Sequence, residues 1–240
     1  MDAKYWHQKW DDEKIGFHQA EINKRLVSFW QQLSVSVDTS QNSSVDNSDP
    51  EKASCVFVPL CGKSQDMLWL HQQGHQVLGI ELSNKAAQAF FTDNHLSFET
   101  LPKGQFTVLA GTAEAAGITI MVGDYFALTP EHCKSCTAFY DRASMIAMSP
   151  DMRERYTQQL ATLLADRCRG LLLTISYDQT QMQGPPFSVS DESVQKMLGN
   201  AFIINELAHF SGPERVGNLK ERGLETLDER VYLLERKVVT

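Results

Sequence analysis

The residues with the clearest chemical meaning lie in one stretch, 56–83, where a carboxylate follows an apolar run. The apolar run 56–60 ends in a small-residue turn at 61–64, and a helix-patterned stretch leads to a second apolar run that ends on Glu81. This pattern predicts a strand–turn–helix–strand unit with Glu81 at the tip of its second strand. In doubly wound α/β proteins that tip faces the ribose of an adenosine-containing ligand, and a carboxylate there accepts hydrogen bonds from the ribose hydroxyls. Glu81 follows Gly62 by 19 residues, close to the spacing that this role needs.

Three classes of adenosine-containing ligand compete for this turn. A P-loop requires G-x-x-x-x-G-K-[ST] to wrap phosphates, and Phe57 stands where its first glycine is needed. A dinucleotide fold requires G-x-G-x-x-G for a pyrophosphate, whereas this turn has one glycine, Gly62, preceded by bulkier residues at 59–61. S-adenosylmethionine carries no phosphate, so its turn tolerates such residues. The pattern therefore favours S-adenosylmethionine over ATP and NAD, with an ordinary strand–helix–strand unit that binds no ligand as the remaining alternative.

Three sets of residues resemble the thiopurine S-methyltransferase family, most closely its bacterial members. The sets are W-H-Q-K-W at 6–10 with G-F-H-Q at 16–19, P-L-C-G-K-S at 59–64 with G-I-E-L-S at 79–83, and Y-D-R-A at 140–143 with S-Y-D at 176–178 and G-P-P-F at 184–187. Their order and rough spacing fit the family. The resemblance covers nearly the whole chain except residues 34–53.

The resemblance implies a set of site residues at the carboxyl ends of the strands, where ligands of open α/β sheets bind. The residues implied to contact S-adenosylmethionine are Trp10, Leu60, Glu81 and Arg142, with Asp124 and Tyr125 flanking its adenine. The first helix, with Trp6, Trp10 and Phe17, is expected to close over cofactor and substrate.

Structural roles are the alternative for several of these residues. Trp6 and Trp10 lie one helical turn apart, so both fit a place in the core. The neighbours Asp141 and Arg142 fit a structural ion pair, and Asp124 fits a helix cap. Glu81 is the hardest to explain structurally, because a carboxylate that ends an apolar strand needs a partner.

The implied activity is transfer of a methyl group to the sulfur of a thiopurine or another aromatic or heterocyclic thiol. Such a thiol ionises near neutral pH and attacks in line, so the protein mainly aligns the reactants and excludes water. A nearby cation favours the thiolate, and Arg142 is the first candidate for this role. Arg215 and Arg222 are weaker candidates, because residues 210–224 match the family loosely. No metal and no dedicated general base are required.

The G-P-P-F stretch at 184–187 differs from the Asn/Asp-Pro-Pro-aromatic signature of amine methyltransferases. It lacks the leading Asn or Asp and follows the fifth expected strand rather than the fourth. We expect it to form a rigid aromatic wall over the acceptor pocket.

Other functions remain open at this point. One is methyl transfer to another soft nucleophile, such as a selenium, tellurium or halide species. Another is a non-catalytic sensor of an adenosine ligand, which Trp10, Glu81 and Arg142 would serve without turnover. A nicotinamide oxidoreductase is the most distant alternative.

The composition is that of a soluble globular protein, with 42% hydrophobic and 22% charged residues. The net charge of −8 argues against nucleic acid or an acidic membrane surface as a partner. No segment has the length of a membrane span and the N-terminus lacks a signal peptide, so we expect a cytoplasmic monomer. Five cysteines suit a reducing compartment, and Cys133 with Cys136 lacks the second ligand pair of a zinc site.

The element pattern predicts a doubly wound α/β fold, and the resemblance implies a mostly parallel seven-stranded sheet with helices on both faces. This is the Rossmann-like class I methyltransferase architecture, with an antiparallel edge strand near the C-terminus. We expect one domain over 1–240, with an N-terminal helical cap at 1–33 and a flexible loop at 34–54, which is rich in Ser, Asn and Asp. Ser83 and Ser190 are expected to begin helices, as is Pro150, and the runs 106–110 and 118–122 fit a hairpin.

Overall fold

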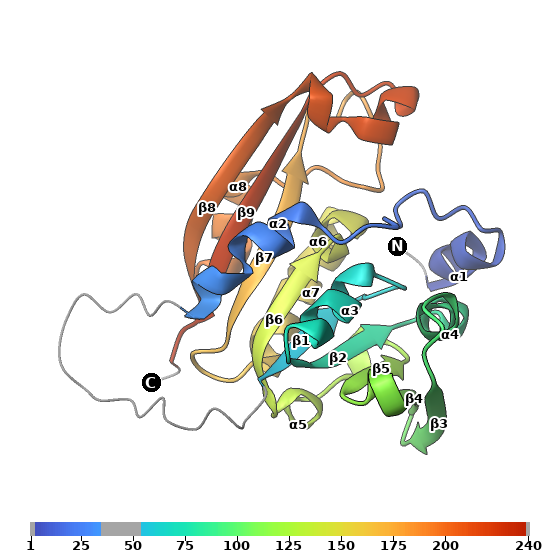
Figure 1. Ribbon diagram of the computed structural model, residues 1–240. Helices are drawn as coiled ribbons and strands as arrows, with labels where there is room; N and C mark the ends of the chain where they lie inside the picture. The colour runs from blue at the N-terminus through green and yellow to red at the C-terminus, as the bar shows by residue number, and fades with distance from the viewer. Residues whose placement is uncertain (1–2, 35–53, 239–240) are drawn as a thin grey trace.

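The computed structural model describes residues 3–34 and 54–238, so most of the loop expected at 34–54 lies outside the described residues. Its centre is a nine-stranded sheet of order β3-β4-β5-β2-β1-β6-β7-β9-β8 (Figure 1). The strands are β1 (Cys55–Pro59), β2 (Gln76–Glu81), β3 (Phe98–Lys103), β4 (Phe106–Gly111), β5 (Ile118–Val122), β6 (Cys136–Arg142), β7 (Arg169–Ser176), β8 (Phe202–Gly212) and β9 (Leu227–Arg236). The strands β5, β2, β1, β6 and β7 run parallel, and the strands at both edges of the sheet are antiparallel. The doubly wound α/β prediction is confirmed.

The parallel centre explains why the strands read as continuous apolar runs. All five residues of β1 are buried, because helices cover both faces of the sheet. The chain moves from β1 to β2 on one side and later to β6 on the other. This reversal of direction at β1 opens a crevice at the carboxyl ends of the strands, the usual ligand position in such sheets.

The helices begin where the sequence places capping side chains. Ser83 accepts a hydrogen bond from the amide of Ala86 at the start of α4, and Ser190 accepts one from the amide of Ser193 at the start of α8. The α-helices are α1 (Ala3–Asp11), α2 (Lys24–Phe29), α3 (Gln65–Gln72), α4 (Asn84–Asp93), α5 (Pro130–Cys133), α6 (Ser144–Ala147), α7 (Pro150–Leu163) and α8 (Asp191–Leu198). Short 3₁₀ helices are η1 (Trp30–Ser34), η2 (Ala113–Ala115), η3 (Tyr125–Ala127), η4 (Pro213–Arg215) and η5 (Gly217–Arg222).

The structure corrects three expectations. The sheet has nine strands rather than seven, because β3 and β4 both extend its edge beyond β5, with β4 and β5 antiparallel as expected. Its C-terminal edge has two antiparallel strands rather than one, since β9 pairs with β7 and β8 pairs with β9. The helical cap at 1–33, expected with a break only near Gly16, is non-helical over all of residues 12–23.

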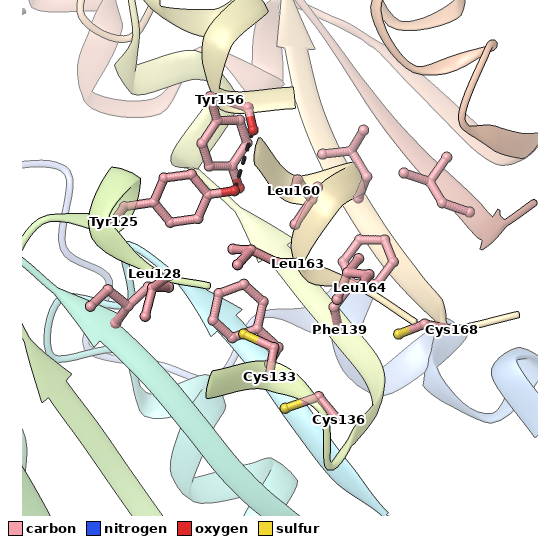
Figure 2. Close-up of a cluster of buried hydrophobic side chains, with 14 of the residues drawn as sticks. Tyr125, Leu128, Cys133, Cys136, Phe139, Tyr156, Leu160, Leu163, Leu164 and Cys168 are labelled. Atoms are coloured by element: carbon pink, nitrogen blue, oxygen red, sulfur yellow. Dashed lines mark hydrogen bonds between the residues drawn. The ribbon is translucent and has the colours of Figure 1, made fainter. Parts of the chain in front are cut away.

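The core has two parts, one on each face of the sheet. Alternate residues of β1 face opposite sides, so that Val56 and Val58 pack with α2, α3 and α4, whereas Phe57 packs with α7 and α8. Figure 2 shows part of the second side, where Phe139 and the apolar face of α7 pack close to Cys133 and Cys136. All five cysteines are buried free thiols. Within the described residues, no helix is long and apolar enough to cross a membrane.

Candidate active site

A cavity of about 1300 Å³ lies at the carboxyl ends of the parallel strands, under the N-terminal segment. It gathers every residue that the sequence singled out for cofactor or substrate: Trp10, Phe17, Leu60, Glu81, Asp124, Tyr125, Arg142, Arg215 and Arg222. Residues more than two hundred positions apart in the sequence thus line one space. Its size exceeds the range of about 300–1,000 Å³ typical of small-molecule sites, which leaves room for two ligands side by side.

Glu81 is held at the tip of β2 by two backbone donors. Its Oε2 accepts a hydrogen bond from the Gly62 amide and its Oε1 accepts one from the Ser83 amide, both at 2.8 Å. Burial raises the pKa of Glu81 above its ordinary value, and these amide hydrogen bonds lower it in part. Each carboxylate oxygen has a further lone pair for a ligand in the cavity.

The turn between β1 and α3 is shaped to bring backbone close to a ligand. Leu60 has a φ of +47° and Gly62 a φ of +53°, both in the left-handed region that non-glycine residues rarely adopt. A Cβ on Gly62 would lie 3.3 Å from the Trp10 ring, so the glycine lets the indole pack directly on the turn. Backbone strain at Leu60 fits a functional site, where such conformations concentrate.

Three aromatic side chains of the N-terminal segment form one wall of the cavity. The Phe17 ring meets Trp6 and Trp10 edge-on, at centroid distances of 5.5 and 5.4 Å. Trp10 is buried, so it also serves as core, as its helical spacing with Trp6 suggested. Phe17 is 42% exposed and is therefore free to cover a ligand.

Arg142 is paired with a residue that the sequence did not single out. Its Nε donates to Asp66 Oδ2 at 2.7 Å, and its Nη2 donates to Ser64 Oγ at 3.1 Å. Arg142 therefore does not pair with Asp141, because successive residues of β6 point to opposite faces of the sheet. Asp66 therefore compensates part of the charge that Arg142 could offer to an acceptor.

Asp141 lies on the other face of β6, away from the cavity. Its Oδ2 accepts a hydrogen bond from the Tyr156 hydroxyl at 2.6 Å. Complete burial raises the pKa of Asp141 from 3.8 to about 6, although the Tyr156 hydrogen bond acts in the opposite direction. This carboxylate supports the core beneath the site rather than the site itself.

Asp124 and Tyr125 follow β5 at the next strand end. Asp124 caps η3, since its Oδ1 accepts a hydrogen bond from the Phe126 amide at 2.9 Å. The Tyr125 hydroxyl donates to the Tyr156 carbonyl at 3.3 Å, as Figure 2 shows. The capping alternative for Asp124 is thus correct, and both side chains nevertheless line the cavity.

The far end of the cavity is lined by residues 184–186 and 214–222. Arg222 donates to the Pro185 carbonyl at 2.6 Å, and Arg215 lies 5.1 Å from the centre of the Phe210 ring. Pro185 and Pro186 face the cavity, but Phe187 is not among its lining residues, so the expected wall lacks its aromatic member. The Phe187 amide instead donates to the Ile146 carbonyl at 2.6 Å.

The charges that line the cavity differ in sign from those of the whole chain. Its cationic lining residues are Lys9, Lys14, Lys63, Arg142, Arg155, Arg215 and Arg222, and its acidic ones are Glu81, Asp124, Glu214 and Glu229. Several of these cations are already paired, Lys63 with Asp93, Arg142 with Asp66 and Arg215 with Glu214. His18, which also lines the cavity, has a lowered pKa because of partial burial and of the nearby Lys63 and Arg142. Its imidazole is therefore neutral near pH 7.

The sequence profile described as Thiopurine S-methyltransferase matches residues 1–237. The chain belongs to the thiopurine S-methyltransferase family. A thiopurine S-methyltransferase of Pseudomonas syringae pv. tomato is 41% identical over 238 residues, covering 99% of this chain and 100% of the relative. One from Pseudomonas aeruginosa is 42% identical, covering 98% and 100%. One from Methylococcus capsulatus is 40% identical, covering 98% and 97%.

Solved structures of methyltransferases share the fold of this thiopurine S-methyltransferase family member at low sequence identity. The 1,6-didemethyltoxoflavin-N1-methyltransferase of Burkholderia thailandensis, solved with S-adenosylhomocysteine, superposes with a TM-score of 0.60 at 12% identity, covering 98% of this chain and 87% of that one. The magnesium protoporphyrin IX methyltransferase of Synechocystis, solved with bound SAM, gives 0.59 at 15% identity, covering 99% and 98%. The class I methyltransferase architecture expected from the sequence is thereby confirmed.

Sequence reasoning missed Tyr140, which lines the cavity, and Asp66, which does not line it but binds Arg142. Asp66 lies on α3 beside the buried Met67 and Leu70, and it is itself fully buried. A carboxylate on the apolar face of a helix is the only signal that the sequence carries for it.

Proposed function

We propose that this protein transfers a methyl group from S-adenosylmethionine to the sulfur of a thiopurine or another aromatic or heterocyclic thiol. The products are S-adenosylhomocysteine and the thioether. One observation carries the proposal: in a member of the thiopurine S-methyltransferase family, the Glu81 carboxylate is fixed at the tip of β2 within the large cavity.

The residues present fit S-adenosylmethionine. Glu81 supplies the buried carboxylate for the ribose hydroxyls, and the turn with Gly62 allows close approach without a phosphate-binding glycine run. Asp124 and Tyr125 lie at the neighbouring strand end, where the adenine would lie. Leu60 and Trp10 would complete this half of the site, with Arg142 opposite.

The acceptor would occupy the other half, between Phe17 and the residues that follow β7 and β8. Arg215 and Arg222 lie there. Because Arg215 is paired with Glu214 at 3.4 Å, Arg222 would supply most of the charge that stabilises a thiolate over the neutral thiol. Arg142 contributes less charge than expected because Asp66 compensates it. We therefore assign Arg142 mainly to orienting the ligands and the C-terminal arginines to the acceptor charge.

The chemistry needs alignment more than acid–base groups. S-adenosylmethionine supplies, when bound, a methyl group on a sulfonium, which is already a strong donor. The aromatic wall of Trp6, Trp10 and Phe17 excludes water, and the rigid strand ends fix the approach of the thiolate in line.

We further propose that the protein is a single-domain cytoplasmic monomer. Its five cysteines are free thiols, which suits a reducing compartment. The large apolar side chains that are exposed, such as Phe17, Leu101 and Ile203, come from separate elements rather than one helix or strand face. Light scattering after size-exclusion chromatography tests the monomer, and a dimer mass would contradict it.

The test of the activity is methyl transfer from labelled S-adenosylmethionine to 6-mercaptopurine. We expect labelled S-methyl product with the unmodified protein and a loss of it with Glu81→Ala. Glu99→Ala, an exposed glutamate on β3 away from the cavity, is the matched control and should retain activity. Cofactor binding without transfer to any aromatic thiol would overturn the acceptor assignment, and absence of both would overturn the proposal.

A further inference from the structure

We propose that Asp66 is a positioning residue that couples the closed position of the N-terminal segment to the orientation of Arg142 in the active site. This inference rests on the function proposed above, because the consequence of the coupling is read in methyl transfer. It concerns a side chain that does not itself line the cavity.

Asp66 receives three hydrogen bonds from two separate parts of the chain. Its Oδ2 accepts from Arg142 Nε at 2.7 Å and from the Tyr140 hydroxyl at 3.0 Å, both on β6. Its Oδ1 accepts from the backbone amide of Asn23 at 2.8 Å, in the N-terminal segment. Ser64, which caps α3 through the Asp66 amide, completes the network by accepting from Arg142 Nη2.

The chemistry of this network requires an ionised carboxylate. Asp66 is fully buried, so its charge has to be compensated, and the guanidinium of Arg142 supplies the compensating charge. All three partners are donors, and an amide in the same place would turn one of its two acceptor atoms into a donor. Asparagine is therefore nearly isosteric with Asp66 but does not satisfy the same partners.

Asp66 fixes how Arg142 faces the ligands. The guanidinium is held along one edge, where Nε binds Asp66 and Nη2 binds Ser64. The rest of the group remains available to the cavity that Arg142 lines. Losing the carboxylate frees the side chain to adopt other rotamers, and a displacement of about 1 Å in a positioning group costs about 100-fold in rate.

The same carboxylate fixes the segment that covers the cavity. Asn23 is the N-cap of α2, where its side chain accepts from the Arg25 amide, and its own amide donates to Asp66. Phe17 and His18, which line the cavity, lie in the non-helical stretch that leads into Asn23. Arg25 fixes the other side of this junction through an ion pair with Glu229 at 2.9 Å. A single side chain thus joins the covering segment to the ligand-facing arginine.

The test is a double-mutant cycle of Asp66→Asn and Arg142→Met, measured as kcat/KM with 6-mercaptopurine. We expect Asp66→Asn to lower kcat/KM by about 10- to 100-fold in the unmodified protein and by less than about threefold in the Arg142→Met background. The matched control is Glu235→Gln, which removes a carboxylate from an arginine pair between β7 and β9 that is remote from the cavity. It should leave kcat/KM unchanged.

A second readout reports on the segment directly. Amide hydrogen exchange at Asn23 should accelerate at least about tenfold in Asp66→Asn but not in Glu235→Gln. If Asp66→Asn does not fold, Tyr140→Phe removes one of the three donors and keeps the carboxylate. It should give a smaller loss, about three- to tenfold, with the same dependence on Arg142.

Equal losses in both backgrounds, or no loss at all, would overturn the proposal, as would unchanged exchange at Asn23. Absence of methyl transfer by the unmodified protein would refute the proposed function instead. The exchange at Asn23 would in that case still decide whether Asp66 holds the segment.

Discussion

The sharpest consequence of the site geometry concerns Glu81→Gln, which removes one charge and replaces one acceptor by a donor. Each oxygen of Glu81 accepts one backbone amide hydrogen bond at 2.8 Å, so the new NH₂ group faces either the Gly62 or the Ser83 amide. On that side the NH₂ group also cannot accept a hydrogen bond from the ribose hydroxyl. A hydrogen bond to a charged acceptor contributes about 1.5–3 kcal/mol. We therefore expect the Kd for S-adenosylmethionine to rise by about 10- to 150-fold.

The pH dependence of binding offers a second measure of the same carboxylate. Burial raises the pKa of Glu81, and only its ionised form accepts from both hydroxyls. Cofactor affinity should therefore weaken as the pH falls through this raised pKa, and Glu81→Gln should remove that dependence. Fold stability changes in the opposite sense: the raised pKa favours the folded state in acid, and this contribution is lost as the pH rises through it. The two opposite signs separate a binding effect from a folding effect.

Isothermal titration with S-adenosylmethionine between about pH 5 and pH 8 measures the Kd and its dependence on pH. Glu99→Gln, on the exposed face of β3, controls for a change of charge. An affinity of Glu81→Gln within about threefold of the unmodified protein would refute the assignment of Glu81 to the ribose.

Three further predictions address the core beneath the site, the turn and the aromatic wall. Asp141→Asn should raise the free energy of unfolding near pH 8 by up to about 3 kcal/mol, since the pKa of Asp141 is raised from 3.8 to about 6 and each tenfold change in acidity is worth about 1.4 kcal/mol. Urea unfolding should show that this gain in the free energy of unfolding fades toward about pH 4. An equal gain near pH 4 and near pH 8 would contradict the prediction. Gly62→Ala should lower the free energy of unfolding by about 1 kcal/mol, because Gly62 has a positive φ. It should also weaken cofactor binding by displacing Trp10. An unchanged Kd in titration calorimetry would show that the contact with Trp10 is not important for binding. Phe17→Leu should raise KM for an aromatic thiol about five- to tenfold, because its edge-on contacts with the two tryptophans contribute about 0.5–1.5 kcal/mol each, while an unchanged KM would remove Phe17 from the acceptor site.

The main lines of the fold could be predicted because local signals agree with the sheet. The apolar runs of β1, β2 and β7 and the serine caps of α4 and α8 each have a local physical cause. Strand β3 could not be predicted in this way: it is mostly exposed and lacks alternation, and it is held by pairing with β4.

The site was predictable at strand ends and less so elsewhere. Glu81 stands out because a carboxylate ends an apolar strand, which is visible without a structure. Asp66 does not, because its partners Asn23 and Arg142 lie 43 and 76 residues away in the sequence. Local spacing carries no information about such a meeting, and for the same reason it could not show that Asp66 compensates the charge of Arg142.

The position of α2 and η1 across the sheet has a consequence for how the protein matures on the ribosome. Figure 1 shows α2 over the part of the sheet that contains β7 and β9. Leu26 and Trp30 share their core with Leu173 and Val231, and Arg25 pairs with Glu229, 204 residues later. Helix α2 therefore has partners on β7 and β9 that are synthesised long after it. A nascent chain can assemble the β1–β2 half of the sheet early, but its N-terminal segment has no complete docking surface until β9 has left the exit tunnel. The N-terminal segment should consequently dock on the sheet only after β9 has been synthesised, which places its packing late in the assembly of the fold.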